Sequence, residues 1–362
     1  MKRSQDFVGK GELDCLVLID PSSIRYATGA KISTLGEAIV LVFEDETRIL
    51  TEKTPETLEI NLNVSTNLSF SINEGELAAT SDFLGERLIL MDQISRIPPL
   101  VDLISAELKE KGDRLSKIGI IEDCTPRLFV LGLKKKISGD LINATEYQYL
   151  RAMKDSDEVD AIIQAARLLT AAVQIVKEYF ENSIKLNKIN IMLQEFFSKH
   201  KGANGYCTIK IPTKPNPEYH QISLNVEYEG YYAQAVFPIL NLDNDNETTP
   251  KSDSFYRFER ELDVFCSKLE NREVFSGNIR NVRQKLRPRD GNASVHGIGL
   301  DSVEHPQYSD NLIPRPTTLY TSFMTRIRDL GVLEYGETIL LKEQSNVRLT
   351  RDLYYGELYE AK

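Results

Sequence analysis

The stretch from Ile222 to Pro238 has the clearest alternation of apolar and polar positions in the chain. Its first part, 222–228, alternates with the period of a half-buried strand. Glu229-Gly230 then favours a tight turn, and the apolar run 231–237 is typical of a returning strand. We therefore predict a β-hairpin, and its inward positions Ser223 and Gln234 are candidates for a site because they would lie side by side.

The first 150 residues alternate short apolar runs with segments of helical periodicity. This pattern predicts one compact α/β N-terminal domain, 1–148. The predicted strands are 16–19, 38–43, 48–51, 87–91 and 117–121, and the predicted helices begin after Asp20-Pro21 and cover 99–111 and 126–136.

The second half has longer amphipathic helices followed by strands, which predicts an α+β C-terminal domain, 149–362. Asp155 or Ser156 is expected to cap a helix that runs to Phe180. Further helices are predicted at 189–200, 255–269 and 277–286, and further strands at 295–300, 317–324, 337–342 and 346–350.

Composition limits the class of protein. The net charge of -10 argues against nucleic acid as a partner, because phosphate contacts need a basic face. No run of 18 apolar residues predicts a membrane span, and residues 1–7 lack the apolar core of a secretory signal. A cytoplasmic protein is therefore expected. The four cysteines are too scattered to predict a zinc site or a disulfide framework.

Two of the four histidines lie close to features that could build a site. His220 ends a proline-rich loop directly before the predicted hairpin. His296 lies in Val295-His-Gly-Ile-Gly-Leu300, where glycines allow backbone to pass close to an imidazole.

Several motifs in the same order resemble the creatinase and Xaa-Pro dipeptidase family, the "pita-bread" metallopeptidases. The similar segments cover nearly the whole chain: 13–29, Leu150-Arg-Ala-Met-Lys154, Tyr228-x-Gly-Tyr231, His296-Gly-Ile-Gly-Leu300 and Glu304-x-Pro306. The resemblance implies a creatinase-like N-terminal domain followed by a pita-bread C-terminal domain.

The resemblance also implies a ligand set for two divalent metals, namely two aspartates, one histidine and two glutamates. In this chain those positions fall on Ser223, Gln234, His296, Ser322 and Gly336, and only the histidine is retained. Neutral side chains cannot offset two divalent cations, so no metal cofactor is expected. If the last strand shifts in register, Glu334 or Glu337 takes the place of Gly336, and a single metal on His296 with one glutamate stays open.

The family's substrate-pocket positions fall on His220, Val303 and Glu304. Val303 replaces a histidine, and His305 is not assumed to substitute for it. We expect Ser223, Gln234, His220 and His296 to face one concavity and to hydrogen-bond with one another, directly or through ordered water, in place of a metal.

The favoured hypothesis is a catalytically inactive homologue whose cleft binds a peptide or protein segment. The N-terminal domain of a histone chaperone subunit and certain ribosome-associated proteins are similar scaffolds without the ligands. The alternative is a weak or metal-independent Xaa-Pro peptidase or creatinase-type hydrolase that uses His220 as general acid and base. A third hypothesis is a dimer partner for an active paralogue. Members of the family are often homodimers, so the resemblance also implies a homodimer.

Overall fold

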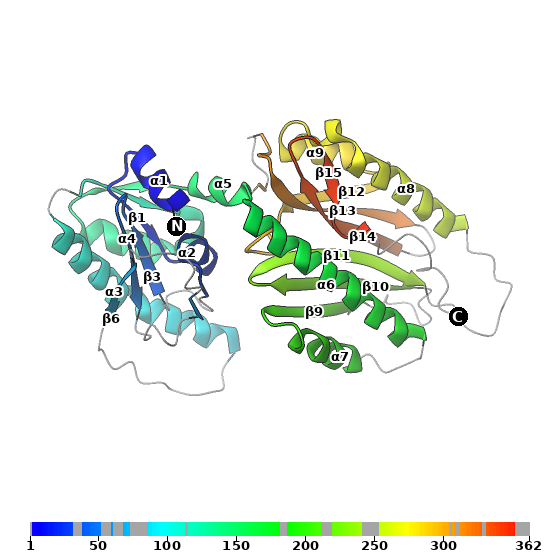
Figure 1. Cartoon of the computed structure of the whole chain (residues 1–362), viewed down its shortest axis with the longest axis horizontal. Coiled ribbons are helices and arrows are strands. Elements are labelled where there is room, and N and C mark those ends of the chain that lie inside the picture. Colours follow the sequence, from blue (N-terminus) through cyan, green and yellow to red (C-terminus); the bar gives the residue numbers. More distant parts are fainter. Residues whose placement is uncertain are drawn as a thin grey trace. The chain divides into compact units, whose positions relative to one another are not determined.

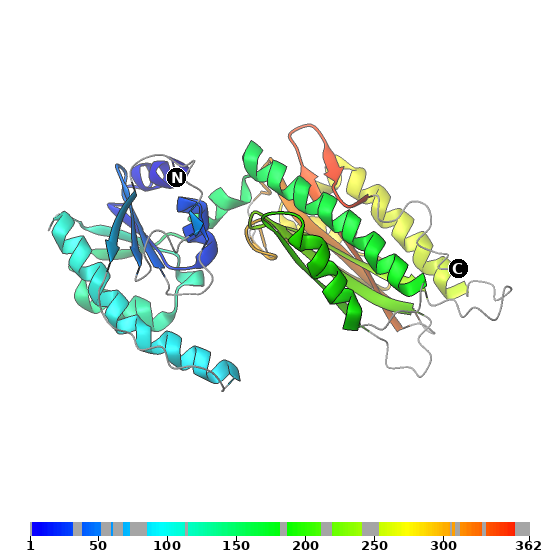
Figure 2. The same ribbon diagram turned by 60° about the horizontal axis from the view of Figure 1, so that its bottom comes forward.

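The computed structural model describes residues 2–31, 38–51, 59–60, 68–72, 85–112, 115–181, 187–210, 219–240, 253–304, 306–307, 312–327 and 331–351. The chain separates into two compact units, Met1–Arg151 and Ala152–Lys362. This boundary lies three residues beyond the expected one. The two units are described separately below (Figures 1 and 2).

Unit 1 is a mixed six-stranded sheet with helices on both faces, in the strand order β6-β4-β3-β1-β7-β8. Its strands are β1 (Cys15–Leu18), β3 (Ala38–Val42), β4 (Thr47–Thr51), β6 (Leu68–Ile72), β7 (Lys117–Ile120) and β8 (Asp140–Asn143), and β2 (Ala30–Lys31) pairs separately with β5 (Glu59–Ile60). Its helices are α1 (Lys2–Lys10), α2 (Pro21–Thr28), α3 (Gly85–Lys111), η2 (Glu122–Cys124), α4 (Arg127–Lys136) and α5 (Tyr147–Ala152), the last of which extends across the boundary.

Each face of this sheet has its own apolar core. Leu16 and Val40 pack with α1 and α2, whereas Val17 and Leu41 pack with α3 and α4. Burial on both faces explains why these strands are continuous apolar runs instead of alternating ones. The α/β fold expected for this part of the chain is confirmed.

The predicted strand at 87–91 is wrong, because this segment lies inside α3. A short apolar run such as Leu88-Ile-Leu-Met91 cannot be assigned to helix or strand from periodicity alone. Pro98 and Pro99 lie within the helix and do not begin it, as the sequence had suggested.

Unit 2 has its helices packed on one face of a single antiparallel sheet. The helices are α6 (Ser156–Glu181), α7 (Asn187–Ser198), α8 (Asp253–Glu270), η3 (Arg272–Phe275) and α9 (Ile279–Leu286). Asp155 caps α6 reciprocally, since its carboxylate accepts from the amide of Glu158 and its own amide donates to the Glu158 carboxylate. Figure 1 shows α6 lying along the strands with which it packs.

The seven strands of this sheet are β9 (Ala203–Lys210), β10 (Tyr219–Tyr228), β11 (Tyr231–Leu240), β12 (Gly291–Gly297), β13 (Thr317–Ile327), β14 (Gly331–Leu341) and β15 (Asn346–Arg348). Their order is β12-β13-β14-β11-β10-β9, and β15 also pairs with β14. The predicted hairpin is confirmed as β10 and β11. Glu229 and Gly230 form its turn, and both have a positive φ, as a type I′ turn requires.

Candidate functional site

Alternation along the hairpin separates its side chains into two sets. Ile222 and Leu224 of β10, with Ala235 and Phe237 of β11, pack into the core beneath the helices. Their neighbours in sequence lie on the opposite face, because successive strand residues point to opposite sides. Ser223 therefore belongs to the face of the sheet that the helices do not cover.

The register brings the five metal positions of the resemblance onto this one face. Ser223 lies opposite Val236, which is opposite Gly336, which in turn is opposite Ser322. We use the name polar face for this surface, defined by Ser223, Asn225, Gln234, Val236, Ser294, His296, Tyr320, Ser322 and Gly336. Ser223 and Gln234 are not directly opposite each other, because Gln234 pairs with Asn225.

The centre of the polar face is a seam between β11 and β14, where only Val236 and Gly336 pair through the backbone. On one side of this pair, the Thr338 hydroxyl accepts from the amide of Gln234 at 2.9 Å and donates to its carbonyl at 2.8 Å. On the other side, the Gln221 side chain donates to the Glu334 carbonyl at 2.8 Å and accepts from its amide at 3.0 Å. Side chains thus replace ladder hydrogen bonds, and Pro238 opposite Gln221 could not have donated one.

Tyr320 fills the middle of the polar face. Its side chain is 4 % exposed and clusters with Val236 and Ile298. Its ring centroid lies 5.2 Å from that of His296. A Cβ added at Gly336 would overlap the Tyr320 hydroxyl. The sequence analysis did not single out Tyr320, although it shares a strand and a face with Ser322.

The sequence predicted a network of hydrogen-bonded side chains on the polar face, whereas the structure has a packed cluster around Tyr320. Within the described residues, Oε1 of Gln234 is buried and has no protein hydrogen-bond partner. Gln234 therefore does not make the direct hydrogen bond from its side-chain oxygen that the expected bridge requires.

His296 is a neutral, partly buried imidazole. Its Nδ1 lies 2.9 Å from the carbonyl oxygen of Gly297, so Nδ1 carries the proton and donates. Burial lowers the pKa of His296, and this hydrogen bond to Gly297 opposes the shift. The ring therefore presents an unprotonated Nε2 at neutral pH.

These residues do not fit a two-metal centre. Of the five positions only His296 is a good ligand, and no carboxylate offsets the cation charge at the other four. Within the described residues, no three His, Cys, Asp or Glu side chains are grouped so that they could hold a metal ion.

The two glutamates close to Gly336 do not restore the centre. Glu337 points to the helix-covered face, where Arg348 binds its carboxylate at 2.8 to 3.1 Å. Glu334 pairs with Met324, whereas His296 pairs with Tyr320. These two rows are four residues apart, about 13 Å along the strand at ~3.3 Å per residue, so His296 and Glu334 cannot share one metal.

The three substrate-pocket positions of the resemblance are dispersed. His220 pairs with Ile239, which lies in the core beneath the helices, so His220 does not share the face of Ser223. Burial lowers its pKa. Val303 is half exposed, and His305 lies outside the described residues.

Glu304 forms a buried ion pair with Lys154 that the sequence did not predict. Its carboxylate contacts Nζ of Lys154, and the two side chains are 3 % and 1 % exposed. A Cβ on Gly299 would overlap both groups, so this glycine is needed for the close approach. The pair ties the segment that follows β12 to the residue that precedes the cap of α6.

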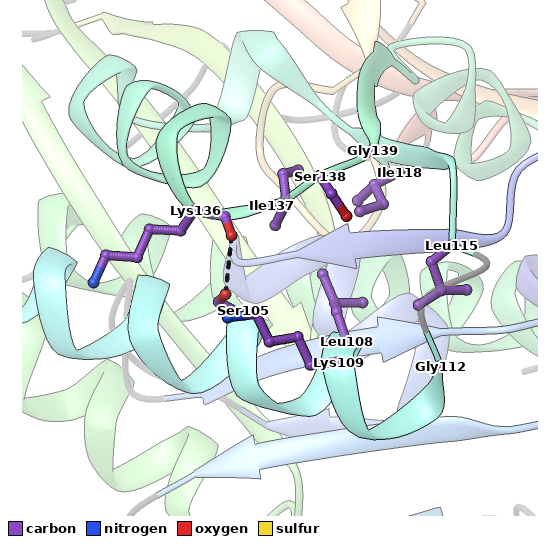
Figure 3. A pocket seen from close by; sticks show the side chains of 10 residues that line it. All are labelled: Ser105, Leu108, Lys109, Gly112, Leu115, Ile118, Lys136, Ile137, Ser138 and Gly139. Carbon is purple, nitrogen blue, oxygen red and sulfur yellow. Dashed lines mark hydrogen bonds between the residues drawn. The ribbon is translucent and has the colours of Figure 1, made fainter.

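A separate pocket lies in unit 1, away from all of these positions. Figure 3 shows it between the end of α3, with Ser105 and Lys109, and the segment Lys136–Gly139 that follows α4. It contains none of the predicted site residues.

The apolar character of α6 has a structural explanation. Within the described residues it is the one helix that is long and apolar enough to cross a membrane, over Ser156–Glu178. Ala165, Leu169 and Val173 lie in the core of unit 2. A core helix of a soluble protein has these same features.

Comparison with known proteins gives the fold. No protein-family model and no curated protein sequence matches this chain. Among solved structures, it is similar to an Xaa-Pro dipeptidase from Bacillus anthracis, with 15% identity over 97% of this chain and 96% of the other and a TM-score of 0.68. An X-Pro aminopeptidase from Thermotoga maritima matches with 16% identity, coverage of 96% and 97%, and a TM-score of 0.67.

A third solved structure is similar and carries a different kind of name. The N-terminal domain of the FACT complex subunit SPT16 from Cicer arietinum matches with 13% identity over 98% of this chain and 95% of the other, at a TM-score of 0.61. The chain therefore has the creatinase-like, pita-bread fold of the Xaa-Pro dipeptidases, as the motifs predicted. At these identities the likeness concerns the fold, and the chemistry must be argued from the site.

Proposed function

We propose that this protein has no peptidase activity and binds a peptide or protein segment on the polar face. The proposal rests on which side chains make up the polar face. Four of its five metal positions are residues without a charge to offset a divalent cation, and Tyr320 packs against Val236 and into the space beside Gly336. A metallopeptidase of this fold needs that space for ions that activate water.

The exposed part of the polar face suits a peptide. Tyr206 of β9 is 53% exposed and belongs to the same face, because it lies opposite Asn225. Asn225 itself is 5% exposed and lies opposite the partly buried Gln234, so the phenol is the accessible end of a row that continues into two amides. Amide side chains can donate to and accept from a peptide backbone, and tyrosine is enriched at binding surfaces. These three side chains carry no charge, which favours an uncharged segment.

Two further parts of the proposal come from the sequence: the resemblance implies a homodimer, and the composition favours a cytoplasmic location. A similar fold is found in the N-terminal domain of a FACT complex subunit, which supports a binding function for a protein of this fold. The hydrolase alternative depended on His220 as general acid and base, and the position of His220 on the other face gives it no support.

Site-specific photo-crosslinking tests the binding face. A photoreactive phenylalanine analogue replaces Tyr206 on the polar face, or Ile191 on α7, which is 59% exposed on the helix side of the same unit. In native extract, position 206 should yield a specific crosslinked partner that excess unmodified protein competes away, and position 191 should not. Equal crosslinking at the two positions, or none at 206, would contradict the proposal.

Peptidase assays test the proposed absence of peptidase activity. With Mn²⁺, Co²⁺ or Zn²⁺ present, Xaa-Pro dipeptides and longer Xaa-Pro peptides should remain uncleaved. Cleavage that is lost in a His296→Ala variant would contradict an inactive protein and favour the hydrolase alternative.

A further inference from the structure

Besides the missing ligands, the polar face has a second feature that bears on metal binding, namely the close packing of Tyr320 against Gly336. Gly336 has no left-handed backbone that would require glycine. What it requires is space, because a Cβ at this position would overlap the Tyr320 hydroxyl and lie 2.7 Å from Cβ of Ser322. Tyr320 and Gly336 are thus a matched pair, in which the large side chain occupies the volume that the small residue leaves free.

We infer that Tyr320 actively excludes divalent metal from the polar face, so that returning the missing carboxylates would not by itself restore a metal centre. A glutamate at 336 must place its Cβ where the Tyr320 hydroxyl lies. The ring also lies beside His296, the one retained ligand. The inference concerns the interior of the face and does not depend on whether a peptide binds at its exposed part.

Tyr320 does not itself replace a ligand. Burial raises the pKa of its phenol well above the usual value, so the group is neutral at physiological pH. The neighbouring Ser322 hydroxyl opposes this rise in the pKa without reversing it. The residue therefore acts through volume, as an apolar plug with Val236 and Ile298.

Two multiple variants test this directly. The first carries Ser223→Asp, Gln234→Asp, Ser322→Glu and Gly336→Glu, and the second adds Tyr320→Ala to these four. Mn²⁺ binding is measured by titration calorimetry and by the thermal shift on adding Mn²⁺. The second variant should bind Mn²⁺ at least about tenfold more tightly than the first. Equal Mn²⁺ affinity in the two variants, whether tight or undetectable, would overturn the inference.

A double-mutant cycle keeps the test valid if either multiple variant fails to fold. Gly336→Ala should lower the melting temperature by several degrees in the presence of Tyr320, and by less than half as much in a Tyr320→Ala background. The decrease in melting temperature that remains in this background comes from the close approach of the new Cβ to Cβ of Ser322. Additive effects would show that Tyr320 and Gly336 are not matched, which would overturn the inference. Neither test measures peptide binding, so failure here is distinct from failure of the proposed function.

Discussion

Arg348 on β15 holds the carboxylate of Glu337 on β14 through both of its oxygen atoms, with Nε at 3.1 and 2.9 Å and an Nη at 2.8 Å. The two side chains are 2% and 0% exposed. Tyr335 donates a hydrogen bond to the same carboxylate at 2.8 Å. A residue that the sequence offered as a metal ligand is thus part of the core that attaches the last strand to the sheet.

Removing one member of this pair should be costly. Glu337→Gln leaves Arg348 buried without its principal counter-charge, and we expect a loss of about 3–5 kcal/mol in the free energy of unfolding. Chemical denaturation measures it. The control is Arg257→Ala, which breaks an exposed pair with Asp290 and should cost less than about 1 kcal/mol. A cost for Glu337→Gln no larger than that of the control would contradict this role.

Stability should depend on the protonation of His296. Because burial lowers its pKa from the usual 6.5, the folded state binds fewer protons than the unfolded state just below that pH. The stabilisation is complete above pH 6.5 and is lost as the pH falls towards the lowered pKa. His296→Gln should therefore flatten the curve of unfolding free energy against pH between about 5 and 7.

His220 also has a pKa lowered by burial, so the comparison needs a matched variant. His220→Gln should flatten the curve independently, and the two effects should add, because the residues lie on opposite faces of the sheet. If wild type and His296→Gln give curves of the same slope, the assigned state of His296 is wrong.

The ion pair of Lys154 and Glu304 should hold the segment that follows β12. Glu304→Gln leaves a buried ammonium close to the N-terminus of α6, where the helix dipole also disfavours a cation. We expect faster amide hydrogen exchange at Gly297 and Glu304, since the Gly297 amide donates to the Pro306 carbonyl at 2.8 Å and the Glu304 amide donates to the Gly297 carbonyl at 2.9 Å. Val303→Ala, a change in the exposed neighbour, should leave exchange near the wild-type rate. Unchanged exchange in Glu304→Gln would contradict the role of the pair.

The sequence was sufficient for those parts of the site that depend on local periodicity. The alternation of 222–228 and the Glu229-Gly230 turn set the faces of the hairpin, and the same period of two places Ser322 correctly relative to its own strand. His220 was assigned to the face of Ser223 from the resemblance and not from the alternation. It lies two residues before Ile222, so the period of two places it on the core side with Ile222. The strand prediction for 87–91 was wrong because the apolar run is too short to show a period.

The contacts that decide the chemistry could not be predicted, because they join distant segments. Lys154 and Glu304 are 150 residues apart, and a pairing between two residues among many charged ones carries no local signal. Tyr320 looked like an ordinary strand residue. Its meaning depends on Gly336, which becomes its neighbour only through the register of β13 and β14.

Metal content is the most direct test of whether this pita-bread fold lacks a metal centre. The purified protein is dialysed against Mn²⁺ and desalted, and bound metal is counted by mass spectrometry. We expect fewer than about 0.2 ions per chain, because four of the five positions are neutral and the remaining one is the imidazole of His296. Retention of two ions per chain, lost on His296→Ala, would contradict this description of the site.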